Sequence, residues 1–263
     1  MNPGATESAL VLRGVKGTLC AVTGAARGIG FVIAEHLAAQ GARVACLDVS
    51  ERRLQSVMAK LGGAGSAIRG YHCDVSSRSD VAAVFARIAS DFDAPVKVLV
   101  NNAMWTRFQP LAEIDDETME RTIAVGLKSL VFTMQAAVPG MKVSGGGSIV
   151  NFSSVGALRP VENSIVYAAV KSAVLGLTRA AAVELGKHRI RVNAVLPGMI
   201  GTEAALGNFD EATLERRRSR IPLGRFGEPA EIAEAVGFLA SESSLYVQGS
   251  SFAIDGGWSI AAA

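Results

Sequence analysis

Short apolar runs rich in Val and Ile alternate with longer segments of helical periodicity along nearly the whole chain. This alternation is typical of βα units that build a parallel sheet. Because the runs carry apolar residues at consecutive positions, both faces of each strand need cover, which favours a doubly wound α/β sheet with helices on both faces over a β-sandwich. Seven strands are predicted, at residues 18–23, 43–48, 67–73, 96–101, 148–153, 191–196 and 251–254.

The segments between these runs have apolar residues spaced near the 3.6-residue period of a helix. No Pro/Ser-rich linker, repeat or low-complexity tract interrupts them, and 263 residues with 49% hydrophobic residues suffice for one substantial core. We therefore expect a single domain over residues 1–263, with a loose segment before about Leu12. Helices are predicted at residues 29–40, 51–61, 78–92, 116–143, 164–187 and 229–241.

Charge and composition argue against several classes of partner. The net charge of +2 lacks the basic excess with which proteins usually bind nucleic acid or an acidic membrane surface. The longest unbroken apolar stretches, residues 81–86 and 165–170, have six residues each, whereas a membrane span needs about 20. The first ten residues lack the basic and apolar regions of a signal peptide. We expect a cytoplasmic protein without nucleic-acid or membrane partners.

Cysteine and histidine are sparse in this chain. The three cysteines are too few for a disulfide framework and lack metal-ligand spacing, so we interpret Cys20, Cys46 and Cys73 as buried apolar thiols in strands. The three histidines are scattered along the chain as well. The sequence therefore predicts no metal site.

The first predicted strand runs into a glycine-rich turn, Thr23-Gly24-Ala25-Ala26-Arg27-Gly28-Ile29-Gly30, and a helix follows at once. A strand, a tight turn and a helix N-terminus bring backbone N–H groups and the positive end of the helix dipole to one place, where a pyrophosphate can bind. The spacing is G-x-x-x-G-x-G rather than the usual dinucleotide pattern G-x-G-x-x-G. Phosphate binding is the favoured interpretation, and a simple turn is the alternative.

The second strand ends at Asp48, 18 residues beyond the last glycine of the turn. A carboxylate near this distance can accept hydrogen bonds from both ribose hydroxyls of adenosine and repels a 2′-phosphate, so Asp48 favours NAD over NADP. The alternative is that Asp48 caps the next helix. Arg52 and Arg53 begin that helix and are the residues able to reach a 2′-phosphate. Residues 74–75 and 101–103 close the third and fourth strands at the same edge, where open α/β sheets bind ligands.

Tyr167 and Lys171 are four residues apart in the long predicted helix, so both lie on one face and the ammonium can lie beside the phenol. A phenol with a pKa of about 10 is a poor base at neutral pH, but a nearby cation favours the phenolate. Tyr167 is therefore a candidate general acid and base. The preceding strand ends in Ser153-Ser154, which places a hydroxyl at the carboxyl edge of the sheet.

Together these residues resemble the short-chain dehydrogenase/reductases. The resemblance covers nearly the whole chain, from the glycine-rich turn through Asn101-Asn102-Ala103 and Tyr167-Ala168-Ala169-Val170-Lys171 to Pro197-Gly198 and Asp255-Gly256-Gly257. It implies a Rossmann-like fold and hydride transfer between a nicotinamide cofactor and a secondary alcohol or ketone. NAD is the expected cofactor because of Asp48, and a homotetramer is the expected assembly.

The resemblance also implies roles for individual positions. Tyr167 exchanges the substrate proton, and Lys171 lowers the pKa of Tyr167 and holds the nicotinamide ribose. Ser154 hydrogen-bonds the substrate oxygen, with Ser153 as the alternative. The implied cofactor contacts are Gly24, Arg27, Gly28, Ile29, Gly30, Asp48, Asp74, Val75, Asn101, Ala103, Tyr167, Lys171, Pro197, Gly198, Ile200 and Thr202.

Two positions depart from the family pattern. Met104 stands where the family has Gly after Asn-Asn-Ala, and together with Trp105 it is a candidate for the wall of the substrate pocket, with plain packing as the alternative. Gly126 replaces a helix Asn that, in the family, holds a water between the catalytic Lys and solvent. We expect an active enzyme in spite of this loss, and a Gly126→Asn variant with equal or higher activity if the space beside Gly126 is open.

Two other functions are compatible with the sequence. A chain with an incomplete proton relay can serve as an NAD-binding regulatory module, and the same tyrosine can serve a lyase or dehydratase. Retention of Ser154, Tyr167 and Lys171 together favours the oxidoreductase. The substrate is not specified, although loop residues such as Leu158 and Met199 indicate a pocket that accepts a bulky apolar or aromatic group.

Overall fold

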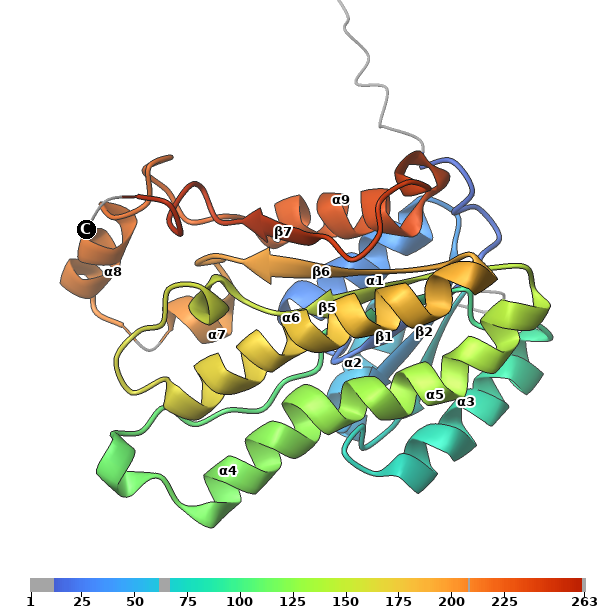
Figure 1. Ribbon diagram of the computed structural model, residues 1–263, viewed down its shortest axis with the longest axis horizontal. Coiled ribbons are helices and arrows are strands. Elements are labelled where there is room, and N and C mark those ends of the chain that lie inside the picture. Colours follow the sequence, from blue (N-terminus) through green and yellow to red (C-terminus); the bar gives the residue numbers. More distant parts are fainter. Residues whose placement is uncertain (1–11, 62–66, 208, 262–263) are drawn as a thin grey trace, which may run out of the picture.

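The computed structural model describes residues 12–61, 67–207 and 209–261. Within these residues, seven parallel strands form one sheet in the order β3-β2-β1-β4-β5-β6-β7 (Figure 1). The expected loose segment before Leu12 lies outside the described residues. The strands are β1 (Leu19–Thr23), β2 (Arg43–Asp48), β3 (Ile68–His72), β4 (Val98–Asn101), β5 (Gly147–Phe152), β6 (Ile190–Pro197) and β7 (Ser251–Ile254).

Helices cover both faces of this sheet. The longer ones are α1 (Gly28–Ala39), α2 (Glu51–Leu61), α3 (Arg78–Phe92), α4 (Asp116–Ile123), α5 (Ser129–Val143), α6 (Ile165–Leu185) and α9 (Pro229–Ala240). In Figure 1, α3 to α6 lie on the near face, whereas α1, α2 and α9 lie on the far face. In β1, Cys20 and Val22 pack into one core and Leu19 and Ala21 into the other, because neighbouring side chains of a strand point to opposite faces. The predicted doubly wound α/β fold is confirmed.

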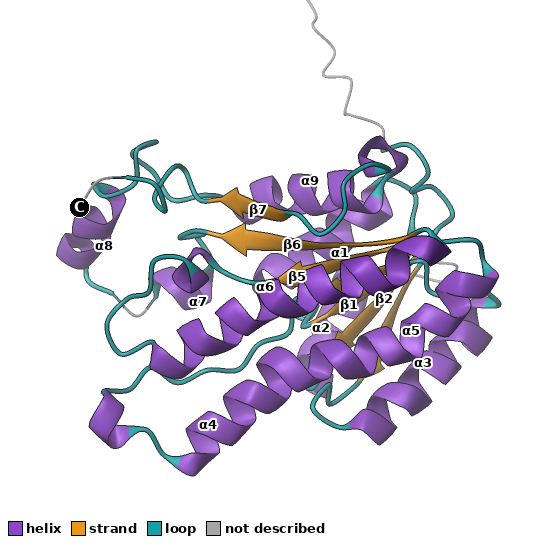
Figure 2. Cartoon of the chain, in the orientation of Figure 1, coloured by secondary structure: helices purple, strands orange, loops and turns teal. Residues whose placement is uncertain are grey.

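The structure differs from the predicted elements at two places. The predicted helix 116–143 is interrupted, because a π-helical turn, η2 (Ala124–Lys128), separates α4 from α5. Such a turn inserts one residue into the helical ladder, which an apolar period does not reveal. Two short helices, α7 (Glu203–Leu206) and α8 (Glu211–Arg218), were not predicted, because short segments lack a recognisable apolar stripe. Figure 2 shows both beside the carboxyl ends of the strands.

The strand order reverses between β1 and β4. From β1 the chain proceeds outward to β2 and β3, and from β4 it proceeds outward to β5, β6 and β7. The helices that follow β1 and β4 therefore leave on opposite sides of the sheet. In open α/β sheets, this arrangement opens a crevice at the carboxyl ends of the two central strands.

All three cysteines are buried free thiols. Cys20 and Cys46 lie in β1 and β2, whereas Cys73 lies one residue beyond β3. Burial raises the pKa of each thiol to about 12, so the three side chains stay protonated at neutral pH. They serve as small apolar packing residues.

A chain of buried side-chain hydrogen bonds crosses the centre of the sheet. Asn101 Nδ2 donates to Asn151 Oδ1 at 2.9 Å, and Thr133 Oγ1 donates to Asn101 Oδ1 at 2.7 Å. Asn151 Nδ2 donates in turn to Thr178 Oγ1 at 3.1 Å. The network ties β4 and β5 to α5 and α6, and so holds the two strands whose ends border the crevice.

Replacing Asn151 by Ala is expected to lower the free energy of unfolding by about 3 kcal/mol, because the amide of Asn101 and the hydroxyl of Thr178 lose a buried partner. Chemical denaturation measures this change. Glu184→Ala, on an exposed position of α6, is the control and should stay within about 0.5 kcal/mol of the wild type. Equal losses in the two variants would contradict a specific role for the network.

Candidate active site

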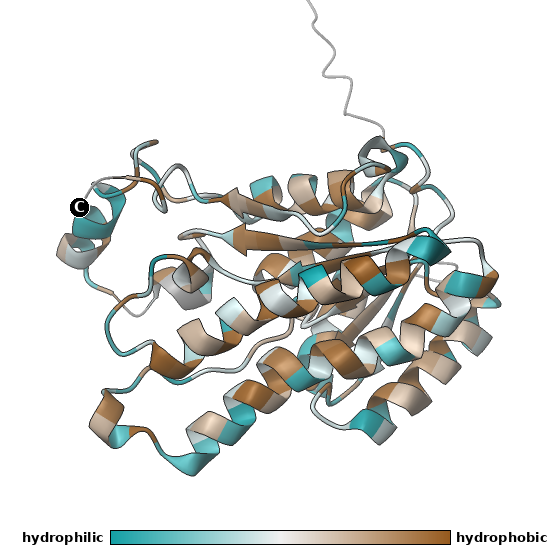
Figure 3. Cartoon of the chain, viewed as in Figure 1, coloured by the Kyte–Doolittle hydropathy of each residue, from teal (hydrophilic) through white to brown (hydrophobic). Residues whose placement is uncertain are grey.

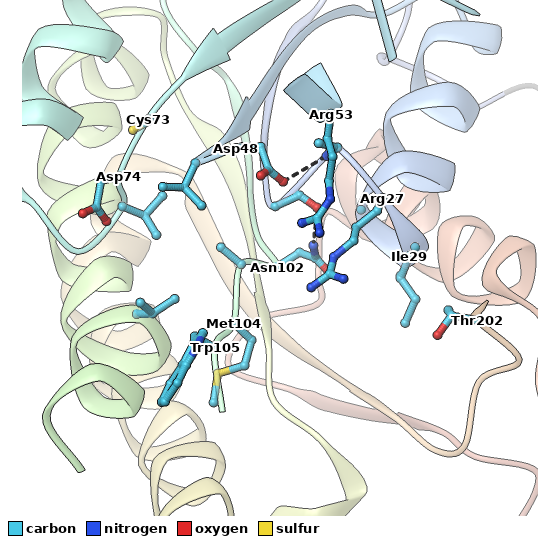
Figure 4. Close-up of a pocket in the computed structure, with 18 of the residues that line it drawn as sticks. Arg27, Ile29, Asp48, Arg53, Cys73, Asp74, Asn102, Met104, Trp105 and Thr202 are labelled. Atoms are coloured by element: carbon cyan, nitrogen blue, oxygen red, sulfur yellow. Dashed lines mark hydrogen bonds between the residues drawn. The ribbon is translucent and has the colours of Figure 1, made fainter. Parts of the chain in front are cut away.

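A cavity of about 1130 Å³ opens at the carboxyl ends of the central strands (Figure 4). The glycine-rich turn after β1, the end of β2 and the residues that follow β3 and β4 contribute to its walls. Chain segments far apart in the sequence thus meet at the edge where a ligand was expected. The predicted cofactor residues that line this cavity are Gly24, Arg27, Gly28, Ile29, Gly30, Asp48, Asp74, Val75, Ala103 and Thr202.

The glycine-rich turn has the geometry of an anion site. Gly24 and Gly28 have φ angles of 65° and 55°, a region that favours glycine. At Gly30 a Cβ would run into the carbonyl oxygen of Gly24 and the amide of Asn102. The helix α1 begins without a capping side chain and without an acidic residue in its first turn. Its first N–H groups and the positive end of its dipole are therefore available to a pyrophosphate.

Asp48 hydrogen-bonds two backbone segments at the edge of the cavity. Its Oδ2 accepts a hydrogen bond from Ala26 N at 3.1 Å, and its Oδ1 accepts one from Ser50 N at 2.9 Å. The carboxylate therefore holds the glycine-rich turn and the start of α2 while also lining the cavity. Arg27 and Arg53 lie beside it in Figure 4. A carboxylate and two guanidinium groups therefore share this end of the cavity.

Asn102 lines the cavity, whereas Asn101 does not. Asn102 Nδ2 donates to Thr23 O at 3.0 Å and to Gly24 O at 3.2 Å, so it braces the glycine-rich turn. The side chain of Asn101 is turned into the buried network and is absent from the cavity lining. Neighbouring residues of a strand end point in opposite directions, which explains the difference. The Asn101 side chain thus supports β4, and its expected cofactor contact stays a prediction.

Ser154, Tyr167 and Lys171 form a second cluster at the end of β5 and on the first turns of α6, outside the lining of the main cavity. Lys171 Nζ lies 5.8 Å from the centre of the Tyr167 ring and donates to Phe152 O at 2.8 Å. Ser154 Oγ accepts a hydrogen bond from Gly156 N at 3.0 Å, and both this hydroxyl and the Tyr167 ring border Gly156, so Ser154 lies on the side of the phenol. Ser153 instead donates to the carbonyl oxygen of Lys171 at 2.7 Å. Of the two serines, Ser154 is therefore the one that faces the phenol.

Burial shifts both titrating groups of this cluster. It raises the pKa of the Tyr167 phenol, while the hydrogen bond with Ser154 lowers that pKa by a smaller amount. Burial also lowers the pKa of the Lys171 ammonium to about 8. Both shifts favour the uncharged form of the side chain. A further positive charge beside the phenol would oppose the effect of burial and favour the phenolate.

One aromatic side chain packs beside the phenol. The ring of Phe108 lies 5.5 Å from the ring of Tyr167, tilted by 48°, and is 52% exposed. Leu158, in the loop after Ser154, is exposed as well. The sequence did not predict the role of Phe108, because the loop after β4 has no hydrophobic periodicity that would indicate which residue contacts Tyr167. The open side of the cluster thus offers aromatic and aliphatic surface to a substrate.

The segment after β6 divides between two cavities. Pro197 ends β6, and Gly198 packs so closely on Asp255 that a Cβ would lie 2.6 Å from the Asp255 Cα. Ile200 lines a separate cavity of about 500 Å³, whereas Thr202 lines the main one. Of these predicted cofactor residues, only Thr202 lies in the main cavity lining.

The space beside Gly126 is filled. A Cβ at this buried position would lie 2.8 Å from the Sδ of Met104 and 2.7 Å from the Cγ1 of Val170. Met104 itself lines the main cavity. A tolerated Gly126→Asn variant was expected on the condition of open space, and that condition is not met, because Met104 takes the volume that a side chain at position 126 needs.

Comparisons with known proteins agree with this geometry. Residues 24–259 match the family model described as Enoyl-(Acyl carrier protein) reductase. The chain is 36% identical over 244 residues to D-threitol dehydrogenase from Mycolicibacterium smegmatis, which covers 93% of this chain and 94% of that protein. It is 40% identical over 253 residues to (3R)-3-hydroxyacyl-CoA dehydrogenase from Mus musculus, which covers 92% of this chain and 96% of that protein.

A solved structure shares the whole architecture. It is a blue fluorescent protein from a metagenomic library in complex with NADPH, with 34% sequence identity and a TM-score of 0.86. The match covers 94% of this chain and 99% of that chain. The family-model match over residues 24–259 includes both the glycine-rich turn from Gly24 onward and the Tyr167 cluster.

Proposed function

Because the chain belongs to the short-chain dehydrogenase/reductase family, we propose that it is an NAD-dependent oxidoreductase of secondary alcohols and ketones, with Tyr167 as its general acid and base. The observation that carries this proposal is the cluster of Ser154, Tyr167 and Lys171 close to a cavity whose lining residues suit a dinucleotide. A binding module has no need for all three side chains at one place.

The residues present fit a nicotinamide dinucleotide. The uncapped start of α1 and the crowded glycines suit a pyrophosphate, and Asp48 can accept hydrogen bonds from the adenosine ribose. Asp74 and Val75 line the same cavity, where the adenine is expected, and Thr202 lines it on the side of β6. Bound there, the cofactor supplies the hydride acceptor for alcohol oxidation or the hydride donor for ketone reduction.

The chain's own side chains handle the proton. In alcohol oxidation, the Tyr167 phenolate takes the hydroxyl proton of the substrate, and in ketone reduction the phenol returns a proton to the substrate oxygen. Ser154 donates a hydrogen bond to that oxygen and orients it toward Tyr167. The Lys171 ammonium stabilises the phenolate by its charge. Phe108 and Leu158 favour a substrate with an apolar group next to the reacting carbon.

The test is to incubate the protein with NAD⁺ and a panel of secondary alcohols and to follow NADH by its absorbance. The panel should include polyols and 3-hydroxyacyl thioesters, because relatives carry names of both kinds. Turnover of any member supports the oxidoreductase. Tight NAD⁺ binding without turnover would favour a regulatory module, and loss of water from the substrate would favour a dehydratase.

NAD⁺ is expected to give a kcat/KM at least about 10-fold higher than NADP⁺, because the Asp48 carboxylate repels a 2′-phosphate at close range. The Asp48→Ser variant should lose most of this preference, since Arg27 and Arg53 then face the phosphate without a competing anion. Steady-state kinetics with both cofactors measure the ratio. A wild-type preference for NADP⁺ would mean that the two arginines prevail and would overturn the assignment.

The homotetramer and the cytoplasmic location stay proposals. Two helical stretches, Asp116–Val143 and Ile165–His188, are long and apolar enough to span a membrane by length and composition, yet only 33% and 39% of their apolar windows are buried in the chain. Figure 3 shows brown, hydrophobic segments along α5 and α6. Packing against further copies of the chain would cover this surface. A monomeric mass in solution at micromolar concentration would refute the tetramer.

A further inference from the structure

The helical segment from α4 into η2 holds the two bulky residues that follow Ala103. The ring of Trp105 lies 4.6 Å from the guanidinium carbon of Arg121 in α4. The Sδ of Met104 packs against Gly126 in η2 so closely that a methyl group on Gly126 would not fit. Both residues line the main cavity, so their positions define one of its walls (Figure 4).

Gly126 provides the hollow that receives Met104. It is buried in a π-helical turn, a distortion that often occurs at functional sites. The opposite side of the hollow is formed by Val170, the residue before Lys171. The hollow therefore lies between the cavity wall and the helix that carries Tyr167 and Lys171.

A side chain at position 126 has two neighbours to displace. Val170 is β-branched, belongs to α6 and is 3% exposed, so it cannot move without disturbing the helix. Met104 has a flexible side chain and borders the open cavity. A side chain at position 126 therefore displaces Met104, and the Met104 side chain moves into the cavity.

We propose that Met104 and Gly126 are a coupled pair, in which Gly126 seats the Met104 side chain outside the volume that the dinucleotide occupies, so that Met104 is a positioning residue for the cofactor. This inference rests on the proposed function for the identity of the ligand. The coupling between the two positions rests on their contact alone. The two departures from the family pattern thus depend on each other, and neither substitution is neutral by itself.

The test is a set of variants with NADH binding, measured by fluorescence titration, as the readout. Gly126→Ala is expected to weaken NADH binding about 10-fold, while kcat at saturating cofactor changes less than about 3-fold. Adding Met104→Ala should restore NADH affinity to within about 3-fold of Met104→Ala alone. The matched control adds Val170→Ala to Gly126→Ala, which removes the other close contact. It should leave the loss of affinity in place.

Three results would overturn the proposal. They are unchanged NADH binding in Gly126→Ala, rescue by Val170→Ala without rescue by Met104→Ala, and a kcat loss that exceeds the loss of affinity. If Gly126→Ala does not fold, recovery of the fold by Met104→Ala supports the pair, whereas recovery by Val170→Ala alone contradicts it.

A second readout separates this inference from the proposed function. Chemical denaturation of the two single variants and the double variant gives the coupling between positions 104 and 126 without any ligand. If the wild type binds no nicotinamide cofactor but the positions are coupled, the proposed function fails and the steric pair stands. If NADH binds and the positions are uncoupled, the proposed function stands and the pair is wrong.

Discussion

Replacing Tyr167 by Phe is expected to lower kcat by at least about 100-fold, because a general acid and base contributes on the order of 10²–10⁴ to the rate. The change removes only the hydroxyl, so the ring can still pack against Phe108. Affinity for NADH is expected to stay within about 3-fold of the wild type. Steady-state kinetics and fluorescence titration measure the two quantities.

The chain offers a matched control for this variant. Tyr246 is fully exposed in the segment that leads into β7, at the amino edge of the sheet and away from the active site, so Tyr246→Phe should leave kcat unchanged. Tyr167→Phe with more than about a tenth of wild-type kcat would show that another group carries the proton, and the assignment of Tyr167 would be wrong.

Lys171→Met is expected to abolish measurable turnover and yet to raise the free energy of unfolding at pH 7 by about 2 kcal/mol. Burial lowers the pKa of Lys171 from 10.5 to about 8. The buried charge therefore lowers the free energy of unfolding by about 3 kcal/mol. Loss of the hydrogen bond to Phe152 O offsets about 1 kcal/mol of the gain. Kinetics and chemical denaturation measure the opposite effects.

The same lysine predicts how stability depends on pH. Between about pH 8 and 10.5 the folded state has released the Lys171 proton and the unfolded state has not, so the wild type gains stability as the pH rises. The difference between Lys171→Met and the wild type should therefore shrink over this range. Lys187→Met, at an exposed position, is the control and should show no such trend. A difference that stays constant from pH 7 to 10 would mean that Lys171 is not destabilised by burial.

The sequence by itself determined the order of elements and the fold class. The strands and the longer helices lie within a few residues of their predicted positions, because hydrophobic period, glycine turns and β-branched runs act over a few residues. The pairing of Tyr167 with Lys171 was predictable for the same reason. Both lie one turn apart on one helix, so their proximity follows from helix geometry alone.

Only the tertiary structure decided which neighbouring residue takes each role. Ser154 rather than Ser153 faces Tyr167, and Asn102 rather than Asn101 lines the cavity. These choices depend on the direction of a side chain at a strand end, which adjacent residues with the same chemistry do not reveal. The position of Phe108 beside the phenol was likewise decided by the tertiary structure, because the loop that carries it has no hydrophobic periodicity.

The two departures from the family pattern depended most on the tertiary structure. In the sequence, Met104 and Gly126 are 22 positions apart and read as two separate changes, one adding bulk and one removing it. In the folded chain, the missing side chain of Gly126 is the space that the thioether of Met104 fills. Local propensity contains no information about such a contact, because a close-packed interior sets each volume by neighbours that only folding brings together.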